Sequence, residues 1–168
     1  GKEALGWLLL KYLRSYGPAT EKDFAKWSGC RVSDARDVLR AARDRLTPVV
    51  LDETTLWIDS DDLAALGDEE NGPPPVILLG AFDPILLAYA DTSLMVAEEY
   101  RNQIFRKAGW VSPVILYNGE LVGTWRSTNR QRRPTVTIEL IESLSRRAIA
   151  QVREEVARWY ESPRIQLA

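Results

Sequence analysis

The sequence predicts an α+β protein of two parts, a helical part that ends in a β-hairpin and a β-rich part that ends in a long helix. Three observations support this class. Apolar residues recur at helical spacing in three successive segments, two short apolar runs follow them, and turn signals separate alternating strands in the second half. The acid- and proline-rich stretch 67–75 has the composition of a linker, so we expect domains at 1–66 and 76–168.

Composition narrows the function. The 168 residues suffice for one or two small domains, and 45% apolar with 27% charged residues is typical of a globular chain. The net charge of −2 does not indicate a nucleic-acid binder, so such a function must rest on local basic patches. The sequence has no histidine, which excludes His-based acid–base catalysis, Ser-His-Asp triads and ordinary zinc sites within it. We therefore expect neither a metal nor another cofactor.

Cysteine use and hydropathy bear on location. The single cysteine, Cys30, permits no intrachain disulfide and indicates a reducing compartment, which we take to be the cytoplasm and its nucleoid. No apolar run reaches the roughly 18 residues of a membrane span, so no membrane partner is expected. The chain opens at Gly1 on an apolar helical pattern without a methionine. We interpret it as a piece of a longer protein whose missing N-terminal part is a further partner.

The first two predicted helices are defined by their ends. Apolar residues at helical spacing predict a first helix that ends at Gly17-Pro18. Thr20 is a good N-cap for the second helix, and Asp23, three residues on, completes a capping box. Gly29 closes this second helix.

A third helix and a hairpin complete the first part. Ser33 is the predicted N-cap of the third helix, and 49–58 form a hairpin that turns at Asp52–Thr55. Three short helices followed by a two-stranded hairpin are typical of a winged helix, in which the second and third helices form a helix-turn-helix and the hairpin is the wing. The predicted buried stripe of the third helix comprises Val32, Ala35, Leu39, Ala42 and Leu46.

The second part is predicted to be mainly strands. Val76–Leu79 is a short buried strand, and Asn118-Gly119 is a strong two-residue turn signal between two more. Alternation predicts another strand at 134–139, and the segment before the hairpin is in part helical. An amphipathic pattern predicts a long helix at 142–161.

The third helix carries a candidate DNA-binding face. At about 100° per residue, Arg36, Arg40 and Arg43 fall in one narrow stripe beside the buried one, with Ser33 at the start of the helix. The arginine fork can pair with guanine edges or phosphates. The alternative is a solvated helix in which Arg40 pairs with nearby aspartates.

Two turns differ in charge. Asp52 and Glu53 at the tip of the hairpin would repel phosphates. The loop at 127–134, "STNRQRRP", is instead basic, with Arg130, Arg132 and Arg133 close together in the sequence. Such a loop could reach into a minor groove, where the potential is most negative, or could be an ordinary solvated turn.

Other polar and aromatic residues invite two interpretations. Asp83 is a candidate catalytic carboxylate, although an aspartate before proline more often organises a turn. Trp125 is expected to be a core residue rather than a stacking platform, and the adjacent Arg126 either binds a phosphate or caps a neighbouring strand. The remaining tryptophans lie on apolar faces and are predicted to be core: Trp7, Trp27, Trp57, Trp110 and Trp159.

Four stretches in this order, "LLLKYLRSYGPATEKDFAKWSG", "LLGAFDPILLAYAD", "IFRKAGW" and "VILYNGELVGTWR", carry a family resemblance. They resemble the winged-helix DNA-binding family that includes bacterial DNA glycosylases for bulky alkylated purines and interstrand crosslinks. The resemblance implies tandem winged-helix units and a small β-rich domain that hold DNA on a concave basic surface. Residues 1–66 would be a later winged-helix unit, and 127–134 the counterpart of a hairpin implicated in probing the minor groove.

The sequence departs from the family pattern at two points. Catalytic members carry a Gln-x-Gln motif that positions the attacking water, and no two glutamines of this chain stand two residues apart. Members often have arginine after the aspartate that corresponds to Asp91, where this chain has Thr92. The first departure argues against catalysis by this chain alone, and the second against an anion contact at that point.

The hypothesis that follows is a DNA-binding portion of a glycosylase-like repair protein, with double-stranded, damaged DNA as its partner and no catalytic residue of its own. Two alternatives remain from the sequence. One is a winged-helix transcription regulator in which the helix at 142–161 is a dimer face. The other is a protein-interaction module whose arginines pair with acidic partners.

Overall fold

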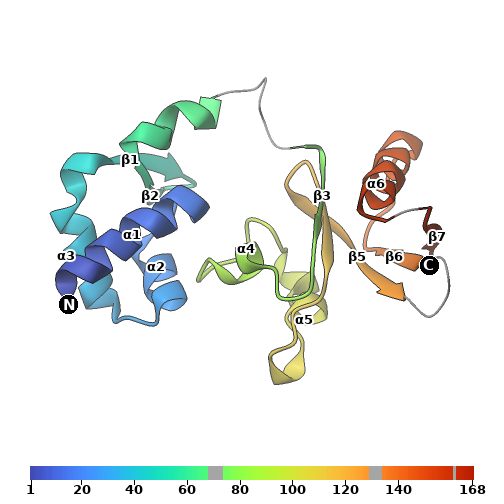
Figure 1. Ribbon diagram of the computed structural model, residues 1–168, viewed down its shortest axis with the longest axis horizontal. Helices are drawn as coiled ribbons and strands as arrows, with labels where there is room; N and C mark the ends of the chain where they lie inside the picture. The colour runs from blue at the N-terminus through green and yellow to red at the C-terminus, as the bar shows by residue number, and fades with distance from the viewer. Residues whose placement is uncertain (68–73, 129–133, 161) are drawn as a thin grey trace. The chain divides into compact units, whose positions relative to one another are not determined.

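The computed structural model describes residues 1–67, 74–128, 134–160 and 162–168 (Figure 1). The chain divides into two compact units. Unit 1 comprises Gly1–Gly72 with Pro84–Asp91, and unit 2 comprises Pro73–Asp83 with Thr92–Ala168. The mixture of helices and antiparallel strands confirms the α+β class. Within the described ranges, no helix has the length and apolar character needed to cross a membrane.

Unit 1 begins with three helices, α1 (Lys2–Tyr16), α2 (Glu21–Ser28) and α3 (Val32–Ala41). The capping box of α2 is confirmed, because Thr20 Oγ1 accepts from the backbone N–H of Asp23 and the Asp23 carboxylate accepts from that of Thr20. Gly29 ends α2 in the left-handed conformation, with φ of 73°, as a C-cap glycine does at low steric cost.

The predicted N-cap of α3 is wrong. The helix begins at Val32, its N-cap is Arg31, and Ser33 lies exposed in the first turn. Arg31 enters the helix with extended backbone and its guanidinium binds the carboxylate of Asp34 at 2.9 Å. The side chains at this helix start therefore bind each other, and none accepts from a free backbone N–H of the first turn.

The predicted hairpin is present and longer than expected. Strands β1 (Leu46–Leu51) and β2 (Thr54–Asp59) are antiparallel, and the 3-10 turns η1 (Arg43–Arg45) and η2 (Ser60–Gly67) flank them. Asp52 and Glu53 form the two-residue turn with φ of 45° and 65°, the positive values that a tight hairpin turn of this length requires. Helices and hairpin thus follow the expected order along the chain.

A segment from the second half of the sequence completes unit 1. Residues 84–91, which contain the short helix α4 (Pro84–Leu87), were expected in the second domain but pack with the first unit. Leu86 and Ala88 are both fully buried. The phenol of Tyr12 donates to the carbonyl of Ala88 at 2.9 Å, and the backbone N–H of Ala90 donates to Asp23 Oδ1 at 2.7 Å. The predicted boundary at 76–168 therefore misplaces this segment, because its partners are distant in sequence.

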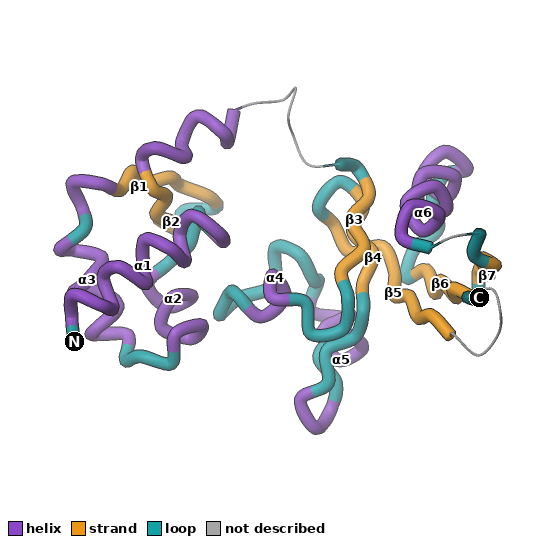
Figure 2. The backbone as a smooth tube through the Cα atoms, in the orientation of Figure 1, coloured by secondary structure: helices purple, strands orange, loops and turns teal. Residues whose placement is uncertain are grey.

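Unit 2 is built on a five-stranded sheet in the order β3-β4-β5-β6-β7 (Figure 2). The pairs from β3 to β6 are antiparallel, and β6 and β7 are parallel. Asn118 and Gly119 make the expected turn between β4 and β5, with φ of 51° and 87°. The strands are β3 (Val76–Leu79), β4 (Val114–Tyr117), β5 (Glu120–Thr128), β6 (Thr135–Leu140) and β7 (Arg164–Leu167).

Helix α6 (Arg146–Trp159) packs on the sheet through Val152 and Val156, which share a core cluster with residues of β3 to β6. It starts later than predicted because Ser145 caps it, its Oγ accepting from the N–H of Ala148 at 3.1 Å. Between Thr92, where the chain re-enters unit 2, and β4 lie three short helical turns, η3 (Glu98–Tyr100), α5 (Arg101–Ile104) and η4 (Lys107–Gly109).

The tryptophans divide into one core residue and several surface residues. Trp125 is buried and its indole N–H donates to the carbonyl of Leu79 at 3.0 Å, which confirms its core role. The prediction of a core location is wrong for Trp7, Trp27, Trp110 and Trp159, which are 62%, 37%, 47% and 54% exposed, and Trp57 is half-buried. Helical or strand spacing indicates an apolar face but does not separate its centre from its edges, where large rings remain partly in water.

Candidate nucleic-acid interface

The outward face of α3 carries Ser33, Arg36 and Arg40, at spacings of three and four residues that place them on one side of the helix. All three are exposed. The opposite side of α3 is buried through Ala35, Val38 and Leu39. Packing of that apolar side against α1 and α2 orients the two arginines to solvent, as the sequence predicts for this pair.

Both arginines form ion pairs with carboxylates at the surface. Arg36 lies 3.3 Å from Glu21, and Arg40 lies 3.7 Å from Asp37. The ammonium of Lys2 binds the same Asp37 at 3.0 Å, and this bond, with a smaller contribution from Arg40, lowers the pKa of the Asp37 carboxyl. Exposed pairs of this kind contribute little to stability because water screens them, so the guanidinium groups remain able to exchange a carboxylate for a phosphate.

Arg43 does not join this face. The helix ends at Ala41 and the chain tightens into η1, where the N–H of Arg45 donates to the carbonyl of Ala42 at 2.9 Å. The spacing that aligned Arg43 with Arg36 and Arg40 assumed a continuous α-helix, so that alignment is wrong. The Arg43 guanidinium lies over the ring of Trp57, 5.1 Å from its centroid, a distance typical of a cation–π contact.

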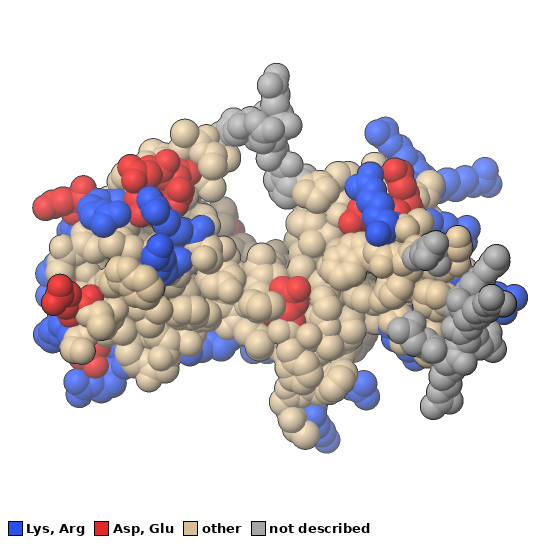
Figure 3. Space-filling model, viewed as in Figure 1, with Lys and Arg blue, Asp and Glu red and all other residues tan. Residues whose placement is uncertain are grey.

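Acidic groups interrupt the basic character of unit 1. Figure 3 shows Lys and Arg intermingled with Asp and Glu on the visible face rather than gathered in one basic field. Asp52 and Glu53 are exposed at the hairpin tip, as the sequence predicts. Asp59 is buried beneath Arg14 and Arg45, which lie 3.5 and 3.6 Å from its Oδ2. The basic side chains of unit 1 therefore lie among acidic ones, on α3 as well as around Asp59.

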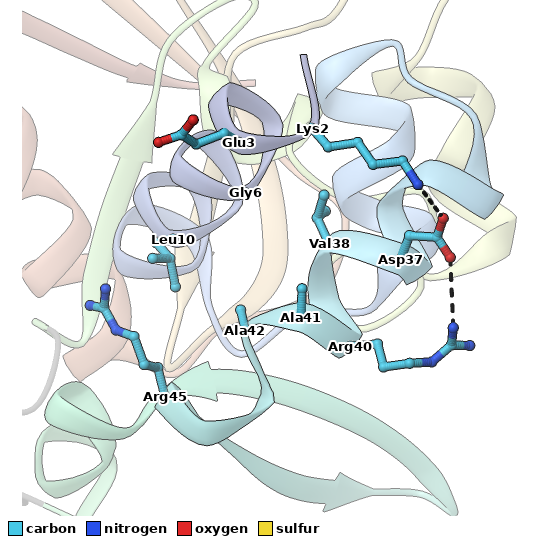
Figure 4. Close-up of a pocket in the computed structure, with 10 residues that line it drawn as sticks. All are labelled: Lys2, Glu3, Gly6, Leu10, Asp37, Val38, Arg40, Ala41, Ala42 and Arg45. Carbon is cyan, nitrogen blue, oxygen red and sulfur yellow. Dashed lines mark hydrogen bonds and ion pairs between the residues drawn. The ribbon is translucent and has the colours of Figure 1, made fainter.

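A groove between α1 and α3 lies beside this face (Figure 4). Its volume is about 670 Å³, and its apolar part comprises Gly6, Leu10, Val38, Ala41 and Ala42. Lys2, Arg40 and Arg45 meet Glu3 and Asp37 around it, so its charges are mixed in sign. Such a lining is not a phosphate cradle, which needs convergent donors.

In unit 2 the structure describes the two strands that flank the basic loop. Strands β5 and β6 pair as far as Thr128 and Thr135, and Arg126 lies on β5 with its guanidinium 3.1 Å from Glu139. The ion pair joins β5 to β6, in line with one of the two roles considered for Arg126, and phosphate binding by Arg126 stays a prediction. Arg130, Arg132 and Arg133 lie outside the described residues, so their role stays a prediction.

Asp83 and Thr92 take part in structural contacts. The N–H of Asp83 donates to the carbonyl of Gly80 at 3.3 Å in the turn before α4, consistent with the turn role. Thr92 is buried and its hydroxyl accepts from Arg101 at 2.9 Å. An arginine therefore reaches this point from α5, which no local signal in the sequence indicates. Within the described part of the chain, no three His, Cys, Asp or Glu side chains gather to hold a metal ion.

Sequence reasoning missed one cluster of exposed groups in unit 2. Phe82 and Trp110, from segments far apart in sequence, lie against each other, and the exposed Arg106 and Lys107 belong to the same turn as Trp110. The adjacent basic residues in "IFRKAGW" are the one local signal of this cluster. The prediction of a core location for Trp110 obscured it, and no sequence pattern marks Phe82 as exposed.

Comparison with known proteins gives concordant results. A family model described as "DNA glycosylase AlkZ-like" matches residues 1–161. The chain is 31% identical over 137 residues to the interstrand DNA cross-link repair glycosylase of Streptomyces sahachiroi, a match that covers 77% of this chain and 36% of that protein. The solved structure of Streptomyces sahachiroi DNA glycosylase AlkZ matches with a TM-score of 0.81 and 25% identity, over 99% of this chain and 46% of that chain. The chain thus spans less than half the length of these relatives.

Proposed function

Because this chain belongs to the AlkZ-like DNA glycosylase family, we propose that it holds duplex DNA on behalf of a repair glycosylase. The resemblance noted in the sequence is thereby confirmed. The cross-link activity is named for the Streptomyces relative. For the longer protein that would contain this chain, we propose DNA with a bulky or cross-linked base as substrate.

The observation that carries the proposal is the exposed face of α3 with Ser33, Arg36 and Arg40. We interpret α2 and α3 as a helix-turn-helix and the β1–β2 hairpin as its wing, an arrangement in which the second helix enters the major groove. Arginine at this position can pair with phosphate oxygens or with the O6 and N7 of guanine. The acidic turn at Asp52 and Glu53 would keep phosphates away from the wing and leave α3 as the contacting element.

Catalysis is proposed to require more than this chain. The sequence has no Gln-x-Gln motif, so no side chain here is assigned to position a water against the glycosidic carbon. The chain alone should bind alkylated duplex DNA without forming abasic sites, which cleavage of the treated DNA by hot alkali would reveal. The regulator and interaction-module alternatives have no comparable support, because the family match extends over nearly the whole chain.

Replacing both arginines tests the proposal. In Arg36→Ala/Arg40→Ala, we expect the Kd for a labelled duplex to rise about tenfold or more, and the slope of log affinity against log salt to fall by roughly 0.9 for each phosphate that is no longer neutralised. Fluorescence anisotropy across a salt series measures both. The matched control is Arg153→Ala/Arg158→Ala on α6, which removes the same charge from exposed positions. Equal losses of affinity in the two variants, or none in the first, would refute a specific role for α3.

A further inference from the structure

A tight turn in unit 2 presents side chains to solvent on a firm base. The segment 104–112 folds back on itself, with the N–H of Arg106 donating to the carbonyl of Trp110 at 2.8 Å and the N–H of Ser112 donating to that of Ile104 at 2.9 Å. Ile104, Val111 and Ser112 are buried and anchor the segment. The turn following α5 projects away from the sheet of unit 2 (Figure 2).

The backbone at the tip adopts a conformation that few residues favour. Ala108 and Gly109 have φ of 63° and 76°, two consecutive left-handed residues. They reverse the chain within η4 and bring Trp110 back beside the start of the segment. Arg106, Lys107 and Trp110 all lie exposed in this turn.

Two aromatic rings lie exposed beside the turn. Phe82 and Trp110 are 44% and 47% exposed, with ring centroids 5.0 Å apart and planes at 79°. Phe82 has φ of 57°, and its N–H donates to the carbonyl of Val111 at 3.3 Å. A bulky residue rarely adopts positive φ unless its surroundings impose it, and such residues concentrate at functional sites. The fold thus holds two apolar rings at the surface, although burial would lower their free energy.

The adjacent cations differ from those of α3. Arg106 and Lys107 are exposed, and among the residues that the structure describes no carboxylate lies within ion-pair distance of either. Arg36, Arg40 and Arg126 each have a carboxylate neighbour. This turn therefore combines two cations, unpaired within the described part of the chain, with two exposed aromatic rings. Such a site suits an anion that also has a flat apolar surface.

We propose that Phe82, Arg106, Lys107 and Trp110, here called the aromatic–basic turn, bind an unstacked nucleobase and its flanking phosphates. Every base has a π-face that can stack on an aromatic ring, while arginine and lysine bind the backbone, the combination used at single-stranded nucleic-acid sites. A protein partner fits this site less well, because only some of its side chains combine a flat face with negative charge. The inference rests on the proposed function, in that DNA is the ligand, but concerns a different surface.

Two short labelled duplexes test the assignment, identical except that one carries a single extrahelical adenine. We expect the full chain to bind the bulged duplex more tightly. Trp110→Leu should lose at least about fivefold of that affinity, the lower end of what one base gains by stacking on an aromatic ring, with little change for the paired duplex. Arg106→Gln/Lys107→Gln should weaken binding to both duplexes and lower the salt slope by roughly 0.9 for each phosphate that these side chains neutralise.

The control for Trp110→Leu is Trp7→Leu, an exposed tryptophan beside a lysine in unit 1. Circular dichroism establishes that each variant is folded, and Phe82→Leu replaces Trp110→Leu if the latter is not. Equal affinity of the unsubstituted chain for both duplexes would overturn the inference and leave the proposed function intact. Equal losses of affinity in Trp110→Leu and Trp7→Leu would also overturn it. Failure to bind either duplex would instead refute the proposed function.

Discussion

Asp23 is a buried carboxylate whose two oxygens serve different parts of unit 1. Its Oδ2 accepts from the N–H and the hydroxyl of Thr20 at 2.8 and 2.6 Å, and its Oδ1 accepts from the N–H of Ala90 at 2.7 Å. The first role was predictable from a three-residue spacing in the sequence. The second was not, because Ala90 lies 67 residues away and its backbone N–H carries no sequence signal.

The phenol of Tyr12 makes a second hydrogen bond between the helical part of unit 1 and the segment 84–91, and the raised pKa of this phenol makes the contact testable. Burial, with a smaller effect of Asp23, raises the pKa of the Tyr12 phenol well above its usual value, so it remains a donor to Ala88. Burial likewise raises the pKa of Tyr89, whose hydroxyl donates to the carbonyl of Tyr16 at 2.8 Å. Both phenols therefore connect 84–91 to α1 throughout the neutral range.

We expect Tyr12→Phe to reduce the free energy of unfolding by about 1 kcal/mol at neutral pH, because the Ala88 carbonyl loses its donor. Above about pH 10 the unfolded chain releases the phenolic proton that the folded chain retains, so the stability of the unsubstituted chain falls as pH rises. Urea unfolding at neutral pH and near pH 11 should show a smaller fall for Tyr12→Phe, with a remainder from Tyr89. An equal fall in both proteins would contradict this account.

Among the elements, α2 and the β4–β5 hairpin, which have specific cap or turn residues, were predicted correctly, whereas the ends of α3 and the short strand β7 were not. Asn118-Gly119 fixes the β4–β5 turn because few other dipeptides adopt two positive φ values. Strand β7 was missed because four residues, Arg164–Leu167, are too short to show alternation. The end of α3 was placed too late because nothing in the sequence between Ala41 and Arg45 breaks a helix.

Close approach of strands makes Gly123 a sensitive position on β5. A Cβ there would lie 2.6 Å from the carbonyl oxygen of Glu139 on β6, beside the irregular pairing at Ile115/Leu116 of β4. We expect Gly123→Ala to destabilise unit 2 by about 1–3 kcal/mol, as overpacking of a close-packed interior does. Gly6→Ala in α1 has open space around the new methyl group and should stabilise by about 0.5–1 kcal/mol. Thermal unfolding of both variants measures the contrast, and equal effects would refute it.

At the scale of the whole molecule, the two units are not successive in sequence. The chain enters unit 2 at Pro73, returns to unit 1 for Pro84–Asp91, and re-enters unit 2 at Thr92. Composition located the linker-like stretch but not this return. Gly, Pro and acidic residues indicate a segment that is not buried, but they do not indicate which of two hydrophobic cores a later apolar segment packs into. The face of α3 was predictable for Arg36 and Arg40 because helical periodicity defines it, whereas the Phe82–Trp110 pair depends on tertiary contacts.

Amide hydrogen exchange tests whether the segment 84–91 folds as part of unit 1. Leu86 is fully buried in unit 1 although it follows β3 in the chain. We expect Leu86→Ala to cost about 2–4 kcal/mol and to increase amide exchange in α1 and α2 while β4 to β6 are unaffected. Val136→Ala, which removes a buried side chain from unit 2, should show the reverse. Faster exchange in both units with either variant would contradict their independence.

The return of 84–91 to unit 1 has a consequence for synthesis on the ribosome. α1, α2 and α3 emerge early, but the first globule lacks Leu86 and Ala88 until the nascent chain has extended to Asp91. By the time Asp91 has emerged, β3 has already left the exit tunnel, whereas its neighbour β4, which follows later in the chain, is still inside it. During that interval β3 is exposed with unpaired backbone groups, while unit 1 is completing its fold and unit 2 cannot yet form. Unpaired strand edges are prone to aggregation, so this is the stage at which a chaperone would bind the nascent chain.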